Sequence, residues 1–113
     1  MNQKLVEEYV LSLPNSKLDY PFGPDVAVYK TVDKMFVLIA ENSKPLRISL
    51  KCDPQLSELL REKYESVMPG YHLNKKHWNT IVLSGQLSWD EVKALITHSY
   101  QLVSGGDSET PVF

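Results

Sequence analysis

Apolar residues recur every three or four positions in three segments of the chain, a spacing that predicts three amphipathic helices. The first helix is expected over residues 2–13 and ends before Pro14. The second begins at Asp53, because an aspartate followed by a proline supplies an N-cap acceptor and a residue suited to the first helical position. Its apolar stripe is expected to consist of Leu56, Leu59, Leu60, Tyr64 and Val67.

The third helix has the sharpest start signal in the chain. Ser88 and Glu91 form a capping box, and Leu87 and Val92 add a hydrophobic staple. The glycine pair at positions 105 and 106 is expected to end this helix. Residues 105–113 are then expected to form a flexible C-terminal tail.

Short apolar runs between the first two helices have the pattern of β-strands. Residues 26–31 and 35–40 are separated by only three residues, Val32, Asp33 and Lys34, which predicts a hairpin. Because residues 35–40 are apolar on both faces, we expect this strand in the interior of a sheet.

Strict alternation of apolar and polar residues marks the next strand, at residues 46–51. Its pattern predicts a sheet with one face covered by helices and the other at least partly in contact with water. Residues 80–84 predict a further strand, which ends at Gly85. Between them, Pro69-Gly70 either ends the second helix or opens an irregular strand.

The segment at residues 15–24 is expected to lack regular structure, since it contains two prolines and a glycine. Its aromatic residues Tyr20 and Phe22 predict a segment that packs back over the core. A proline-aromatic loop of this kind could instead line a ligand groove, although a packed lid is the commoner use.

The predicted order is therefore a helix, three strands, a helix, one or two strands and a last helix. Short connections between consecutive strands favour an antiparallel sheet with the helices on one face, which is a two-layer α+β fold. A chain of 113 residues is expected to form one domain, which we assign to residues 1–104.

Composition narrows the classes of function. The net charge is −2, so the chain lacks an overall basic footprint, and any binding of nucleic acid must rely on a local patch. One cysteine excludes an intramolecular disulfide and fits a reducing compartment. The N-terminus has no signal-peptide pattern, and the longest apolar run is too short to span a bilayer. We therefore expect a cytoplasmic protein with no membrane association.

The region around residues 69–80 holds most of the unusual chemistry, within a window from Ser66 to Trp89 that contains no acidic residue. Tyr71 and Trp78 could serve as stacking faces for bases, and His72 and His77 gain charge below about pH 6.5. The alternative is a solvated lysine pair beside a tryptophan of the core. The candidate phosphate contacts are Lys75, Lys76, His72, His77, Asn74 and Asn79, with Lys30, Lys34 and Arg47 as extensions if the hairpins align.

Other chemistries have weaker support. The spacing of His72 and His77, with Cys52 and His98 distant, does not suit a metal site, and we expect no metal and no cofactor. Cys52 lies near a helix N-terminus, which lowers a thiol pKa, but burial between a strand and a helix is the favoured interpretation. We expect no catalytic residues and no enzymatic activity; a closed pocket joining Tyr20, His72 and Cys52 would favour a small-molecule enzyme.

Several motifs together resemble the MmcQ/YjbR family of small bacterial proteins. They are Tyr20-Pro21-Phe22-Gly23, Lys34-Met35-Phe36, Leu50-Lys51-Cys52-Asp53-Pro54, the stretch from Pro69 to Thr80, and Ser99-Tyr100. The resemblance covers about residues 1–104 and implies an α-β(3)-α-β(2)-α fold similar to CyaY-like and secretion-chaperone-like domains. It also implies a DNA-binding double wing of β-hairpins, here around Asp33-Lys34 and around Asn74-Lys75-Lys76.

Two hypotheses of different classes follow. The first is a monomeric, non-enzymatic domain that binds DNA or another nucleic acid weakly through Lys75, Lys76, His72, His77, Asn74 and Lys34. The second is a protein- or peptide-binding adaptor of chaperone-like type, which uses the open sheet face or the loop at residues 20–24.

Overall fold

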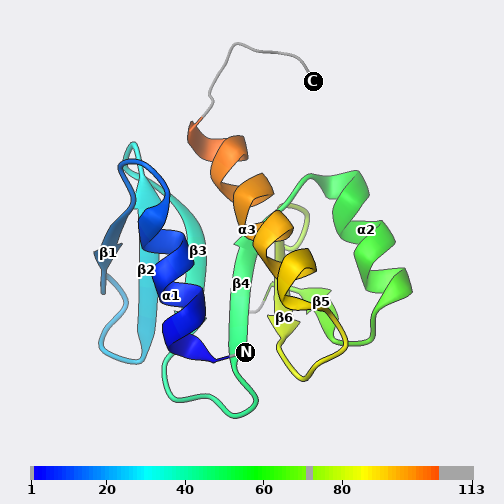
Figure 1. Ribbon diagram of the computed structural model, residues 1–113. Coiled ribbons are helices and arrows are strands. Elements are labelled where there is room, and N and C mark those ends of the chain that lie inside the picture. The colour runs from blue at the N-terminus through cyan, green and yellow to red at the C-terminus, as the bar shows by residue number, and fades with distance from the viewer. Residues whose placement is uncertain (1, 71–72, 105–113) are drawn as a thin grey trace.

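A computed structural model describes residues 2–70 and 73–104 of the chain, with three helices and six strands in that part (Figure 1). The strands form one antiparallel sheet in the order β1-β2-β3-β4-β6-β5. The elements in chain order are α1 (Gln3–Ser12), β1 (Lys17–Asp19), β2 (Val26–Thr31), β3 (Lys34–Ala40), β4 (Arg47–Lys51), α2 (Pro54–Lys63), β5 (Val67–Pro69), β6 (Trp78–Val82) and α3 (Trp89–Ser104).

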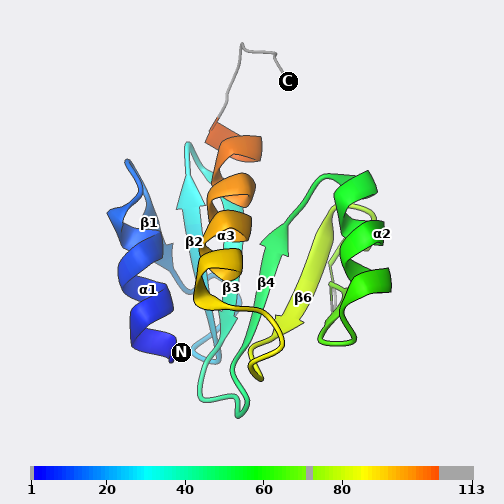
Figure 2. The same ribbon diagram turned by 45° about the vertical axis from the view of Figure 1, so that its right-hand side comes forward.

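The three helices pack on one side of the sheet, which confirms the two-layer α+β class (Figure 2). Val6 and Val10 of α1, with Val92 and Ile96 of α3, are buried against apolar side chains of the central strands. Such burial of apolar surface is the main term that stabilises a domain of this size. The core contributed by the strands includes Ala27, Tyr29, Val37, Ile39, Ile48, Leu50 and Ile81.

All three predicted helix starts are present. The Asn2 side chain accepts a hydrogen bond from the amide of Leu5 at 2.9 Å, and Asp53 accepts from two amides in the first turn of α2. The capping box is reciprocal, with Ser88 N donating to Glu91 Oε1 at 2.8 Å and Glu91 N donating to Ser88 Oγ at 3.1 Å. The expected C-terminal glycine pair and the tail at 105–113 lie outside the described residues.

The expectation for residues 15–24 was wrong in two respects. Residues 17–19 form strand β1, which pairs with β2 and lengthens the first run of strands from three to four. All three residues of this edge strand are exposed, so it leaves no apolar periodicity in the sequence. The aromatics do not pack over the core either, because Tyr20 and Phe22 are 43% and 61% exposed.

Smaller differences concern the segments around β5 and β6. β6 begins at Trp78, two residues before the expected start. Pro69 neither ends α2, which stops at Lys63, nor opens a strand, because it is the last residue of the short strand β5. Leu59, which we assigned to the apolar stripe of α2, is exposed. The sequence pattern thus located β6 with displaced ends, but it missed β5, whose first residue, Val67, we had assigned to the stripe of α2.

The β2–β3 hairpin turns tightly at Val32 and Asp33, whose φ angles are 46° and 65°. Two consecutive positive φ values match the two-residue turn that best joins twisted antiparallel strands. After the turn, a bulge at Phe36 places both Phe36 and Val37 in the core on the helix side. Ser99 of α3 donates its hydroxyl to the carbonyl of Phe36, which ties the bulge to the helix layer.

Replacing Val32 by asparagine is expected to stabilise the protein. A β-branched residue is strained at positive φ, whereas asparagine adopts this conformation readily, and the exposed Val32 side chain gives up little packing. We expect the free energy of unfolding to rise by about 1 kcal/mol in urea denaturation. The Val32→Ala variant is the matched control, since alanine keeps the strained Cβ; an equal gain in both variants would contradict the role of the turn.

Candidate nucleic-acid interface

Positive charge gathers on the strands. The side of the sheet away from the helices, here called the helix-free face, carries Val28, Leu38 and Trp78 as its own small apolar cluster. Arg47 and Lys51 alternate along β4 with Ile48 and Leu50 of the helix-side core, so they project from the helix-free face. The six strands together carry five cations, Lys17, Lys30, Lys34, Arg47 and Lys51, and one anion, Asp19.

Lys17 and Lys30 occupy the same face as Arg47 and Lys51. They are directly opposite each other in the β1–β2 register, and Lys30 is opposite Met35, which packs with the apolar cluster of the helix-free face. Asp19 forms an ion pair with Lys30 at 3.5 Å between Nζ and Oδ2, which reduces the local excess of positive charge. The remaining cations leave this face basic.

The helix layer has the opposite balance, with six acids against four cations. The acids are Glu7, Glu8, Glu58, Glu62, Asp90 and Glu91, and the cations are Lys4, Arg61, Lys63 and Lys93. Although the net charge is −2, the charges are unevenly distributed: the strand side of the molecule is basic and the helix side is more acidic. A local patch of this kind is what a nucleic-acid interface on an acidic chain requires.

The predicted lysine pair lies in a turn at residues 74–77. Asn74 shapes this turn, because its Oδ1 accepts from the amide of Lys76 at 2.9 Å and its carbonyl accepts from the amide of His77 at 3.1 Å. Lys75 and Lys76 are exposed there. Asn74 thus acts mainly on the backbone, and it positions the two lysines.

The turn at 74–77 and the β2–β3 hairpin lie at the same end of the sheet. Trp78 is opposite Lys51, and the carbonyl of His77 accepts from the amide of Cys52 at 2.8 Å. Leu73 and Met35, which neighbour the turn and the hairpin, pack against one apolar cluster on the helix-free face. The two turns therefore align, which brings Lys34 and Lys30 toward the lysine pair, whereas Arg47 is opposite Val82 at the other end of β4 and does not extend the patch around the turn.

Arg61 of α2 anchors the turn from the helix side. Its Nε donates to Asn79 Oδ1 at 2.7 Å, and its Nη2 donates to the carbonyls of Trp78, at 3.3 Å, and of Lys75. Our reading of the sequence did not find this residue, because nothing in the pattern of α2 reveals a contact with a turn 14 residues away. A cation in the last turn of a helix is also common for electrostatic reasons alone, so the position of Arg61 did not distinguish it.

Two of the candidate residues cannot reach a ligand. Trp78 is 6% exposed and Asn79 is 2% exposed, so the first offers no stacking face and the second no phosphate contact. Trp78 instead packs closely on Gly70, where an added Cβ would come within 2.7 Å of the tryptophan Cβ. Tyr71 and His72 lie outside the described residues, and His77 is half-buried.

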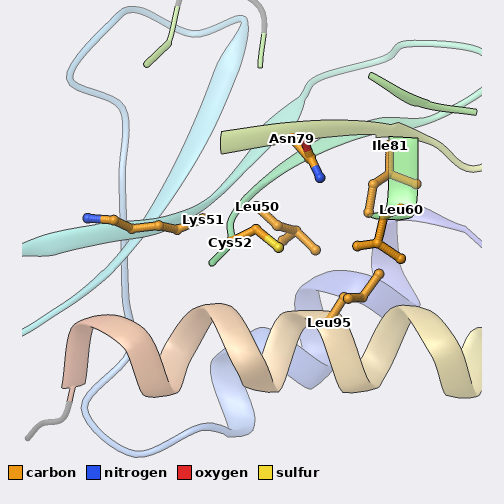
Figure 3. Close-up of a pocket in the computed structure, with 7 residues that line it drawn as sticks. All are labelled: Leu50, Lys51, Cys52, Leu60, Asn79, Ile81 and Leu95. Carbon is orange, nitrogen blue, oxygen red and sulfur yellow. The ribbon is translucent and has the colours of Figure 1, made fainter. Parts of the chain in front are cut away.

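Cys52 borders a small internal cavity (Figure 3). The thiol is 3% exposed, and this burial raises its pKa, which disfavours the reactive thiolate. Asn79 Nδ2 points into the same cavity and has no hydrogen-bond partner among the described residues. At about 10 Å³ the space suits a single water molecule and not a substrate. The lining residues are Leu50, Lys51, Cys52, Leu60, Asn79, Ile81 and Leu95.

Tyr20 lies on a different surface, an open groove of about 560 Å³ lined by Tyr20, Gly23, Pro24, Glu41 and Asn42. Tyr20 and Cys52 thus line two separate cavities. Within residues 2–70 and 73–104, no three histidine, cysteine or acidic side chains come together as metal ligands. None of the described helices is both long and apolar enough to cross a membrane.

These features define an α+β domain with a six-stranded antiparallel sheet, three helices on one face and a basic opposite face. Two solved structures are similar. The Deinococcus radiodurans protein DR2400, with a DUF419 domain, is 38% identical with a TM-score of 0.83, covering 88% of this chain and 75% of that one. A Pseudomonas syringae protein is 34% identical with a TM-score of 0.77, covering 90% and 98%.

The chain belongs to the YjbR family, whose model matches residues 11–102. The protein YbdF of Escherichia coli O157:H7 is 42% identical over 96 residues, which are 85% of this chain and 79% of that protein. The protein YjbR of Escherichia coli K12 is 33% identical over 94 residues, 83% and 80% of the two chains. Both relatives are named as uncharacterised, so they establish the family and leave the activity to be argued from the residues.

The anchor formed by Arg61 gives the first prediction for this region. Replacing Arg61 by lysine keeps the charge but removes the planar fork that bridges Asn79 and the turn, leaving a buried amide oxygen without its donor. We expect a loss of about 1–3 kcal/mol in urea denaturation, with faster hydrogen exchange at the amides of Lys76 and His77. Lys63→Ala, in the same helical turn, is the control and should leave both measurements near wild type. Unchanged exchange in Arg61→Lys would show that the turn is held by other contacts.

His98 gives a second prediction, on pH. Its Nε2 accepts from the amide of Asp53 at 3.2 Å, and burial lowers its pKa from the ordinary value near 6.5, although the charge of Asp53 acts in the opposite direction. Because the unfolded chain binds this proton at higher pH than the folded protein, stability should fall as the pH drops below about 6.5. Urea denaturation between about pH 7.5 and 5.5 tests this. The decline should be smaller in His98→Gln and intact in the control His77→Gln; equal declines in all three proteins would exclude His98 as the cause.

Proposed function

We propose that this is a monomeric, cytoplasmic and non-enzymatic domain that binds nucleic acid weakly through its helix-free face and the adjoining turn at residues 74–77. The segregation of charge carries this proposal, because the strands and the turn concentrate cations in a chain with a net charge of −2. Phosphate contacts by lysine and arginine depend on such a local excess of positive charge.

We expect the protein to recognise the phosphate groups of the nucleic acid and not its base sequence. The burial of Trp78 removes the described aromatic side chain that would stack on bases in this region. Lys34, Lys75 and Lys76 are exposed at one end of the sheet, and His77 beside them adds charge when it is protonated. A few lysine contacts without base readout give weak, salt-sensitive and sequence-independent binding.

In this proposal the two turns act as the wings that the family resemblance implies. One contains Lys34 and the other contains Lys75 and Lys76, and both border the apolar cluster that Met35 and Leu73 share. A phosphate backbone lying across this end of the sheet would meet both turns and continue toward Lys51 and Lys30. Asp33 and Asp19 oppose it, which limits the affinity.

A protein- or peptide-binding adaptor is the second candidate function. The observation that favours it is the exposure of Tyr20 and Phe22 next to an open groove at the other end of the sheet. Large aromatic side chains on a surface are typical of contacts with other proteins. The two functions use different surfaces, so one protein can be tested for both.

The first function predicts binding of labelled single- and double-stranded DNA in fluorescence anisotropy, weakening steeply as salt rises from about 20 to 200 mM. Replacing both Lys75 and Lys76 by alanine should reduce the slope of log affinity against log salt by about 2 for duplex DNA, since each phosphate contact contributes about 0.9. The control is Lys4→Ala with Lys63→Ala, which makes the same change of charge on the helix layer.

Two results would count against this function. No binding at the lowest salt would remove the nucleic-acid assignment, because an exposed basic patch is least screened there. An equal loss in the helix-layer control would show that net charge, and not the turn at 74–77, determines the affinity.

A further inference from the structure

We propose that the open groove beside Tyr20 and Glu41 binds an arginine side chain of a partner protein or peptide. This inference rests on the second candidate function and specifies its ligand. The groove lies between the turn at residues 20–24, which leads into β2, and the loop that follows β3. It is therefore at the end of the sheet opposite the β2–β3 hairpin and the turn at 74–77 (Figure 1).

The carboxylate of Glu41 is held in place by neutral donors. The hydroxyl of Tyr20 donates to its Oε2 at 3.0 Å, and Nε2 of Gln3 donates to its Oε1 at 2.7 Å. The two bonds fix the orientation of the carboxylate and leave its negative charge in place, since neither donor is a cation. The neighbouring carboxylate raises the pKa of Tyr20, which keeps the hydroxyl a donor.

A second carboxylate adds to the negative charge. The same Gln3 amide nitrogen donates to Glu7 Oε2 at 2.9 Å, so the carboxylates of Glu7 and Glu41 share one donor. The ion pairs of the described residues, Lys30–Asp19 and Lys93–Asp90, involve neither of them. Two adjacent carboxylates without a cation of their own are complementary to a positively charged ligand.

The side chains that line the groove favour arginine over lysine. The exposed ring of Tyr20 and the proline at position 24 give it flat apolar surfaces next to the carboxylate. A guanidinium group stacks on such surfaces while it pairs with a carboxylate, and it loses less hydration than an ammonium group. The combination of an oriented carboxylate with a stacking face therefore favours arginine over lysine.

The shape of the groove favours a side chain on a larger partner. Sites for small metabolites usually enclose most of the ligand, whereas this groove of about 560 Å³ is open to solvent. Phe22, exposed at the corner of the same turn, extends the apolar surface beyond the groove. A peptide lying across the turn could place an arginine against Glu41 and apolar residues against Phe22.

The experiment uses the full chain, labelled with ¹⁵N, and three peptides in which glycine alternates with arginine, lysine or the neutral isostere citrulline. We expect the arginine peptide to shift the amides of Tyr20, Gly23 and Asn42, to bind several-fold more tightly than the lysine peptide, and the citrulline peptide to leave them unchanged. Glu41→Gln should weaken binding of the arginine peptide by about tenfold or more, which corresponds to the loss of one charged contact.

Matched variants separate this site from general attraction to an acidic protein. Glu62→Gln on α2 makes the same change of charge away from the groove and should bind the arginine peptide as wild type does. Tyr20→Phe keeps the ring but loses the bond to Glu41, so it should weaken binding only a few-fold, whereas Tyr20→Ala should lose the stacking as well. The folded spectrum of each variant confirms that the comparison is between intact proteins.

Each further outcome overturns a defined part of the proposal. Equal binding of the arginine and citrulline peptides at these amides would reject the cationic ligand and retain an adaptor role. Absence of any shift at the groove would reject the arginine ligand. Concentration-dependent self-association that Glu41→Gln abolishes would identify the occupant as a second copy of this chain instead. Lys75→Ala with Lys76→Ala should bind the arginine peptide normally, which separates this groove from the nucleic-acid interface.

Discussion

The helices of the described residues cover only one face of the sheet, and the composition of the opposite face follows from this constraint. Apolar side chains that point toward the helices join one core, whereas Val28, Leu38 and Trp78 on the helix-free face must be shielded locally. Leu73 and Met35 provide part of that cover. Lysine and arginine suit the surrounding positions, because their aliphatic stems lie on apolar surface while their charges remain in water. The helix-free face is thus basic partly because the stems of its lysine and arginine side chains cover apolar residues that no helix shields.

Local and periodic features of the fold could be predicted from the sequence. The helical spacing of apolar residues predicted α1 and α3, and runs or alternation of apolar residues predicted β2, β3 and β4. The capping residues Asp53 and Ser88 predicted the starts of α2 and α3. Strand β1 escaped prediction because an edge strand held by backbone hydrogen bonds needs no apolar side chain. The exposure of Tyr20 and Phe22 also ran against the general tendency of aromatic residues to be buried.

The candidate interface was predictable in part for the same reason. Lys75 and Lys76 are polar residues in a turn, and their exposure required no knowledge of distant contacts. Asn79 looked equally available, but β6 begins before it and turns its side chain toward the helices, where Arg61 meets it. A contact between α2 and β6 depends on the tertiary arrangement, which a single sequence does not encode in any local pattern.

The shortness of β1 and β5 affects how the protein behaves at high concentration. These strands form the two margins of the sheet, and each is only three residues long. Unpaired backbone groups at a sheet margin recruit strands from other molecules, and long, flat margins are the starting points of fibrils. Here one margin carries Lys17 and Asp19, and the other ends in Pro69, which has no amide hydrogen to offer. A strand from a neighbouring chain could therefore form few backbone hydrogen bonds at either edge of the sheet. We expect the sheet to disfavour edge-to-edge association between molecules.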